Sequence, residues 1–278
     1  MNTAPWSLWR AQVLAILRLE IKKNFLARRG LWVYLLALGP VVLFGGHSLV
    51  MLRHGRACDL GRDNLIFATV FQFFYLRLAV FFGCVGVFMN LFRGEMLEKS
   101  LHYYLLAPVR REVLLAGKYL AGVITTSVIF CTSTALSLAV LYLHFHPSVV
   151  EQYMNGGGLG HVFAYVGTTA LACIGYGGVF LVMSFLFRNP IIPAAVVLVW
   201  ESLNPFLPAV LKKLSVIFYL QSLSPLQPPV KGDWAFLAVL ANPTPAYLAI
   251  PGLLLVTAAG LFLAARQVQK LEINYGAE

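Results

Sequence analysis

Long apolar stretches, separated by short polar ones, dominate the pattern of the chain. Each stretch holds at most one charged residue over 19 to 28 positions, and a transmembrane helix needs about 20 mostly apolar residues. The pattern therefore predicts an all-α membrane protein with six transmembrane helices. The predicted spans are residues 30–52, 65–92, 119–143, 162–187, 191–211 and 247–265, which together make a transmembrane domain of residues 30–265.

A shorter apolar stretch lies between the fifth and sixth predicted spans. Residues 214–223 are too few to cross a bilayer before Ser224 and Pro225 interrupt them. We expect residues 214–241 to form a short re-entrant segment, which inserts partway into the membrane. Because backbone of this kind is tolerated only against protein or a water-filled cavity, the segment is a candidate lining for the mouth of a pathway.

Residues 1–29 have helical periodicity but carry too many charges to cross a membrane. On a helix, Trp9 and Ile16 lie on one side and Arg18 lies on the other, while Glu20 is an exception among the apolar positions. Tryptophan on one face and basic residues on the opposite face are typical of a helix that lies in the membrane interface. We expect such an amphipathic interfacial helix here. The alternative is a plain basic flank of the first span.

Composition supports the membrane assignment. Of the 278 residues, 59% are hydrophobic and 12% are charged, against about 45–50% and about 25% in an ordinary globular protein. This balance excludes a disordered chain and argues against a soluble globule. The net charge of +10 is then assigned to a membrane surface rather than to nucleic acid. Four cysteines exclude a disulfide scaffold.

The distribution of Lys and Arg predicts the orientation. The connections on the side of the two termini carry 14 of these residues, those on the other side carry six, and Arg77 lies inside a span. Both termini are therefore expected in the cytoplasm, in the plasma membrane or the bacterial inner membrane, with residues 266–278 as a cytoplasmic tail. The three arginines between residues 53 and 64 count against this orientation.

The cytoplasmic connection of residues 93–118 combines an apolar ridge with charged positions. Leu97, Leu101 and Leu105 recur at helical spacing, and Pro108 ends that helix because its ring blocks the preceding turn. An apolar ridge bordered by charges suits docking into a groove of a partner protein. The alternative is a solvated loop whose apolar side rests on lipid.

The motifs of this connection resemble those of a known family. Gly94-Glu95, Ser100-Leu101, Leu105-Leu106-x-Pro108-x-Arg110 and Gly117-Lys118 together resemble the intracellular signature of the permease subunit of type-2 ATP-binding-cassette exporters. Ser100-Leu101 departs from the Gly-Thr that is common there. The resemblance implies six spans, an amphipathic N-terminal helix, re-entrant helices between the last two spans, and a second permease copy in a homodimer or heterodimer. It also implies that a separate ATPase subunit docks on the loop and drives alternating access, and the residues expected to couple the two are Glu95, Leu97, Glu98, Leu101, Leu105, Arg110 and Arg111.

The chain has no motif of its own for binding nucleotide. A phosphate-binding loop needs Gly-x-x-x-x-Gly-Lys-[Ser/Thr], but Tyr119 follows Gly117-Lys118, and position 112 is Glu rather than Gly. We expect no cofactor on this chain and no ATPase activity of its own. By the resemblance, ATP and magnesium belong to the partner subunit.

Two charges fall inside predicted spans. Arg77 and Glu201 come to similar depths on antiparallel helices, and an unpaired charge at that depth costs at least about 2.5–3.5 kcal/mol. They are therefore expected to form an ion pair, which either holds the helix bundle together or forms part of a gate. The candidate residues of a pathway or gate are Gln72, Arg77, Glu201, Asn204 and Pro205.

The histidines on the outer side do not predict a metal site. His144 and His146 form a His-x-His pattern near His161, but loop histidines of this kind more often lie in solvent, so no metal site is expected.

An intramembrane enzyme would need paired catalytic groups, and neither Gly-x-Ser-x-Gly nor His-Glu-x-x-His occurs. An ion-coupled secondary carrier is disfavoured by the lack of an inverted repeat. Both remain as alternatives to an exporter permease.

Overall fold

The computed structural model describes residues 5–26, 30–54, 59–97, 104, 106, 108–187, 189–227 and 244–270. These residues are almost entirely helical and include no strand, which confirms the all-α prediction for the part of the chain described. Five helices are long and apolar enough to cross a membrane. The protein is therefore an integral membrane protein.

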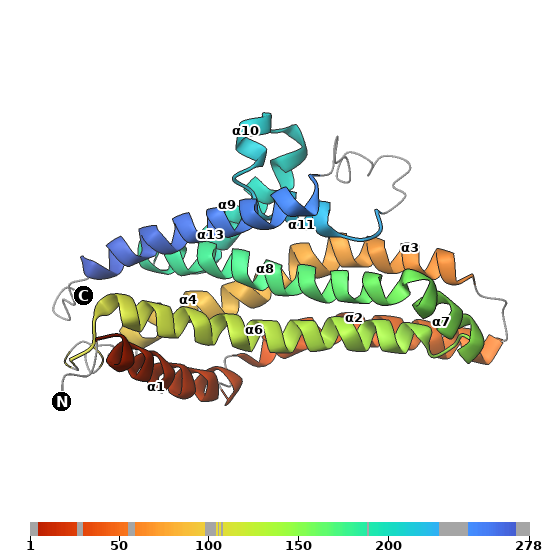
Figure 1. The fold of residues 1–278 in the computed structure, drawn as a ribbon, viewed down its shortest axis with the longest axis horizontal. Helices are drawn as coiled ribbons and strands as arrows, with labels where there is room; N and C mark the ends of the chain where they lie inside the picture. Colours follow the sequence, from red (N-terminus) through yellow and green to blue (C-terminus); the bar gives the residue numbers. More distant parts are fainter. Residues whose placement is uncertain are drawn as a thin grey trace.

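The five long helices run along a common direction as an elongated bundle (Figure 1). They are α2 (Leu31–His54), the continuous helix α3 (Leu60–Val70), η2 (Phe71–Val80) and α4 (Phe81–Leu97), α6 (Arg111–Tyr142), the continuous helix α7 (Pro147–Tyr153), η3 (Met154–Gly158) and α8 (Leu159–Leu186), and α13 (Ala246–Gln269). α6 packs against α2 and α8, and α13 packs against α8. The start of α1 (Pro5–Leu26) and the end of α13 lie at the same end of the bundle, which we call the α1 end, and α7 lies at the other, the α7 end (Figure 1).

The fifth predicted span is shorter than the sequence suggests. α9 (Ile191–Leu203) has 13 residues, which rise only about 20 Å against a hydrocarbon core of about 30 Å. It stops where the short 3₁₀ helix η4 (Asn204–Phe206), which contains Pro205, begins, and Pro208 precedes α10 (Ala209–Lys212). A sixth helix of spanning length is therefore not present among the described residues.

The predicted re-entrant segment is described only in its first half. α11 (Val216–Leu223) has eight residues and packs against α8 and α13. It is a short, largely buried helix, which is too short to cross a membrane. α10 projects from the side of the bundle near α11 (Figure 1). Residues 228–241 of the predicted segment lie outside the described residues.

α1 lies lengthwise along the first part of α6 and runs in the same direction (Figure 1). Ile16 is buried against Gly117, where a Cβ would lie 2.8 Å from the isoleucine side chain. The predicted apolar side of this helix therefore packs against the bundle. Arg18, on the predicted basic side, is exposed, and so is Lys22 one turn later.

Two helical stretches depart from α geometry. η2 is a π-helical stretch in the middle of the second span, and it carries Gln72 and Arg77. η3 holds Gly157, whose φ of 111° is accessible mainly to glycine. The structure shows a kink at this glycine between α7 and α8.

Glycines allow α4, α6 and α8 to approach one another closely. The buried ring of Phe88 on α4 lies between Gly122 of α6 and Gly177 of α8, where a Cβ would come within 2.6 Å and 2.5 Å of the ring. Small residues at such positions are what permit close helix packing inside a membrane.

We expect Gly177→Ala to destabilise the protein by about 1–3 kcal/mol, because the added methyl group has no space beside Phe88. Gly167→Ala is the matched control on the same helix, since no atom lies within 4 Å of its Cβ position. Thermal unfolding of the two variants in detergent checks this. Equal midpoints for both variants would contradict the packing described here.

Candidate coupling site

The ammonium group of Lys118 is the centre of a buried ionic cluster near the α1 end. Lys118 is completely buried on α6, and its Nζ lies 2.5 Å from Oε1 of Glu20 and 2.7 Å from Oε1 of Glu95. The same nitrogen donates to the carbonyl of Leu91 at 3.1 Å. All three ammonium protons therefore have acceptors, and these acceptors come from α1 and α4.

Two further side chains complete this group, which we call the Lys118 cluster. Nζ of Lys23 lies 3.0 Å from Oε1 of Glu95, and the hydroxyl of Tyr104 donates to Oε1 of Glu20 at 3.3 Å. The Tyr104 ring also lies 4.8 Å from Nζ of Lys118. Burial, and then the charges of the two glutamates, raise the pKa of Tyr104, so its hydroxyl remains a hydrogen-bond donor.

The Lys118 cluster balances two ammonium groups against two carboxylates. Burying such charges costs several kcal/mol each, and short contacts with good geometry are needed to offset that cost. Glu20 and Glu95 are both buried. The cluster therefore fixes the position of α1 and the end of α4 against α6, and Tyr104 contacts the same cluster.

Glu95, one of the residues expected to couple the two subunits, lies inside the protein. Its side chain is buried, with Lys118 and Lys23 as partners, because a carboxylate at this depth has stronger cation contacts within the chain. Any part it plays in coupling is then indirect, through α1 and α6.

Arg110 and Arg111 also contact other helices of the same chain. The Arg110 guanidinium lies 4.8 Å from the ring centre of Trp9, and Nε2 of Gln12 donates to the carbonyl of Pro108 at 3.1 Å, so α1 is held to the entry of α6. Arg111 donates to the carbonyl of Gln269 at 2.6 Å, at the end of α13, where a cation suits the helix dipole.

The remaining predicted coupling residues are not all described. Glu98, Leu101 and Leu105 lie outside the described residues, as does the side chain of Leu97, the last residue of α4. Leu106 is 79% exposed, so an apolar side chain next to the predicted ridge faces outward.

The predicted pathway residues described here lie on η2, which packs against α11, and at the end of α9. Nε2 of Gln72 donates to the carbonyl of Leu226 and to Oε1 of Gln227, each at 3.3 Å, which joins η2 to the residues after α11. Nδ2 of Asn204 donates to the carbonyl of Lys212 at 3.2 Å and ties η4 to α10. Pro205 begins the turn between them.

Glu201 does not form the expected ion pair with Arg77. Its carboxylate accepts from the hydroxyl of Ser215 at 2.6 Å and from the backbone N–H groups of Val216 at 3.0 Å and Ile217 at 2.8 Å. No ion pair within 4 Å joins it to Arg77, although the two charges lie within electrostatic range. The reason is that the start of α11 offers a buried carboxylate several unpaired N–H groups and the positive end of a helix dipole.

The His-x-His pattern is divided between two places. Nδ1 of His146 accepts from the N–H of Ser148 at 3.4 Å and caps α7, whereas Nδ1 of His161 lies 2.9 Å from the hydroxyl of Tyr153. His144 turns instead towards α2 and α3. These histidines therefore do not form one site.

Sequence reasoning missed the roles of Glu20, Lys118 and Ser215. One signal was present, because Glu20 is a carboxylate on the apolar side of an amphipathic helix and such a group requires a cation. Nothing in the local pattern around Ser215 shows that Glu201, which lies 14 positions earlier, accepts from its hydroxyl.

A scan of the chain against protein-family models gives no match, and a search of the curated proteins finds none with significant similarity. The proposal for function therefore rests on the residues of the chain and the contacts described above.

We expect Lys118→Met to lower stability by roughly 3–5 kcal/mol, because it leaves two buried carboxylates without their shared cation. Adding Glu20→Gln and Glu95→Gln to the same chain should recover most of the loss, since no buried charge then remains unpaired. Thermal unfolding in detergent measures both effects, with Lys213→Met as an exposed control. A triple variant less stable than Lys118→Met would contradict the assigned pairing.

A double-mutant cycle tests the new partner of Glu201. We expect Glu201→Ala and Ser215→Ala to be non-additive by about 0.5–3 kcal/mol in unfolding free energy, because they remove the two ends of one hydrogen bond. The cycle of Glu201→Ala with Arg77→Ala should give the smaller coupling. The reverse order would restore the Arg77–Glu201 pair as the main interaction.

Proposed function

We propose that this chain is the permease subunit of an ATP-driven exporter of the type-2 ATP-binding-cassette class. The observation that carries the proposal is the Lys118 cluster. It makes α1, the end of α4 and the start of α6 one unit with Tyr104, which belongs to the connection whose motifs resemble the coupling loop of that class.

The contacts of the Lys118 cluster can carry a movement of the docking loop to the rest of the bundle. A separate ATPase subunit that docks on residues 93–118 would move Tyr104 and Arg110, and through them the Lys118 cluster and α1. Motion of α4 then reaches η2, where Gln72 contacts the residues after α11. In this proposal the π-helical stretch and the α9–α11 region form the moving wall of the pathway.

The other parts of the proposal follow from the same class. A second permease copy completes the transporter, and the exposed apolar faces of α2 and α13 are available to this copy and to lipid. ATP and magnesium bind to the ATPase subunit and not to this chain. Both termini lie in the cytoplasm, the α1 helix lies at the membrane interface, and α9 to α11 take the place of a sixth crossing.

Co-expression with a candidate ATPase subunit tests the coupling. We expect Leu101→Asp with Leu105→Asp to weaken docking by about thirtyfold, because charges on the apolar ridge cost about 2 kcal/mol in a groove. The readouts are the affinity of the purified permease for the ATPase subunit and the substrate-stimulated rate of ATP hydrolysis.

The matched control changes two exposed apolar residues near the α7 end. Leu143→Asp with Val149→Asp adds the same charge where the side chains are 68% and 43% exposed. This control should dock normally. Normal docking and normal stimulated hydrolysis in the Leu101 and Leu105 variant would refute the proposed coupling role.

A further inference from the structure

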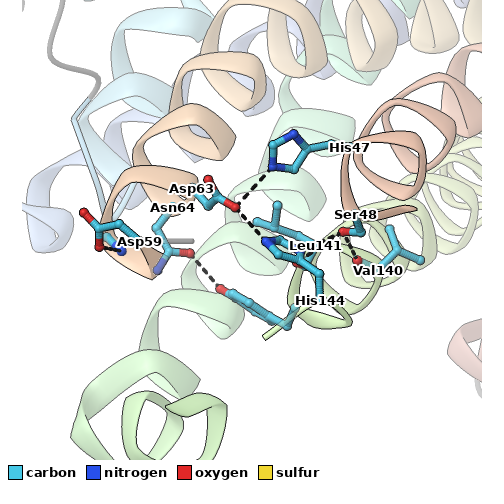
Figure 2. A network of polar contacts seen from close by, with 10 residues as sticks. His47, Ser48, Asp59, Asp63, Asn64, Val140, Leu141 and His144 are labelled. Carbon is cyan, nitrogen blue, oxygen red and sulfur yellow. Dashed lines mark hydrogen bonds and ion pairs between the residues drawn. The ribbon is translucent and has the colours of Figure 1, made fainter. Parts of the chain in front are cut away.

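Two histidines and an aspartate from three different helical regions meet near the α7 end (Figure 2). Oδ2 of Asp63, in the first turn of α3, lies 3.2 Å from Nε2 of His47 on α2 and 3.0 Å from Nε2 of His144, just after α6. The three atoms lie within 4.8 Å of one another. We call these residues the His–Asp cluster.

A serine determines which nitrogen of His144 carries a proton. The hydroxyl of Ser48 has one proton, and it lies 2.6 Å from the carbonyl oxygen of Val140, which can only accept. Its oxygen must therefore accept from Nδ1 of His144, which is 3.1 Å away (Figure 2). In the neutral ring this assignment leaves Nε2 with a lone pair, and this nitrogen faces the Asp63 carboxylate.

The contact between Nε2 of His144 and Asp63 is short but does not have hydrogen-bond geometry. The side chain of His144 is 1% exposed, and its Nε2 has no hydrogen bond to any residue that the structure describes. The carboxylate oxygen therefore lies to one side of the direction in which this nitrogen points. Two atoms that bind one ion are related in this way, because each points at the ion rather than at the other. His144 has this geometry, whereas Nε2 of His47 lies at hydrogen-bond geometry to Oδ2 of Asp63, 3.2 Å away.

The distances also fit a shared metal ion. Zn²⁺ binds imidazole nitrogen and carboxylate oxygen at about 2.0–2.2 Å in a tetrahedral site, which places two ligand atoms about 3.3 Å apart. The two measured separations, 3.2 Å and 3.0 Å, are close to that value. A histidine that binds a metal commonly donates its other N–H to a second group, and Ser48 receives it here.

We infer that His47, Asp63 and His144 bind a divalent transition-metal ion of the Zn²⁺ type. Imidazole ligands select such ions over Mg²⁺ and Ca²⁺, which prefer oxygen. Three protein ligands leave one coordination position for water or a small ligand, and the side chain of His47, 25% exposed, marks the open side. The ion would hold α2, α3 and the turn after α6 together at the α7 end, and this inference is independent of the proposed transport function.

The site is partly prepared by contacts that do not need the ion. Asp59 caps α3 by accepting from the N–H of Gly61 at 2.9 Å, which fixes the turn that carries Asp63. Next to Asp63, Asn64 accepts from the hydroxyl of Tyr142 at 2.9 Å and joins α3 to α6 (Figure 2). The ligands are therefore held near their positions by the fold.

Calorimetric titration of the full-length chain in detergent with Zn²⁺ alone, after treatment with a chelator, tests this inference. We expect one Zn²⁺ to bind per chain, and Zn²⁺ to raise the unfolding temperature of the wild type. His47→Ala should abolish both effects, and its partly exposed position makes it the variant that should fold normally. Ser48→Ala should weaken binding by about 10–100-fold, because it removes the group that orients His144.

His146→Ala and His161→Ala are the matched controls, because both histidines lie outside the cluster near the same end. They should bind Zn²⁺ as the wild type does. Co²⁺ should give a visible spectrum typical of a tetrahedral site in the wild type and not in His47→Ala. Absence of Zn²⁺ binding in the wild type, or equal binding by His47→Ala, would overturn the inference and leave the cluster as an ion pair between Asp63 and a protonated histidine.

Discussion

A lysine ammonium group occupies a position without solvent contact, and the arrangement of the α1 end depends on this constraint. The free-energy cost of burying this positive charge is offset only when hydrogen-bond acceptors and negative charges surround it. Glu20 and Glu95 supply carboxylates from two different helices, and Leu91 supplies a carbonyl. The place of α1 against α6 follows from the contact between Glu20 and Lys118.

Other charges of the described chain follow the same principle with a different partner. Glu201 is satisfied by the first N–H groups of α11, and Arg111 is satisfied by the last carbonyl groups of α13. In both cases a helix end with unpaired backbone groups meets a charge of the suitable sign. Short helices and helix ends thus take the role that water plays at the surface of a soluble protein.

The sequence predicted best what depends on one segment alone. The length of the apolar runs predicted four of the long helices, as well as the final span after Pro245. The helices of the third and fourth predicted spans begin earlier than predicted, at Arg111 and Pro147, because polar residues extend them beyond the apolar runs. The fifth span failed because the apolar run continues through Pro205 and Pro208, whereas the helix ends before them. The π-helical stretch was not predictable, since its residues have the same composition as ordinary helix.

Partners across the chain were harder to predict. The depth of Arg77 and Glu201 suggested a pair, but depth along an axis does not define the direction in which a side chain points around it. The residues that bind Glu201 are its neighbours beyond two prolines, and those that meet His144 are separated from it by whole helices. Such contacts depend on how helices rotate and cross, which the periodicity of a single chain leaves open.

The hydrogen bonds from Arg111 to the end of α13 have a practical consequence for how this protein is studied. They place the last turn of the final helix beside the start of α6, at the side of the predicted docking segment. A bulky tag inserted directly after Lys270 would obstruct a protein that approaches this end. A small fluorophore attached at Gln269 would instead report binding. Its distance to a second fluorophore on a docking subunit would shorten when that subunit binds and lengthen when it dissociates.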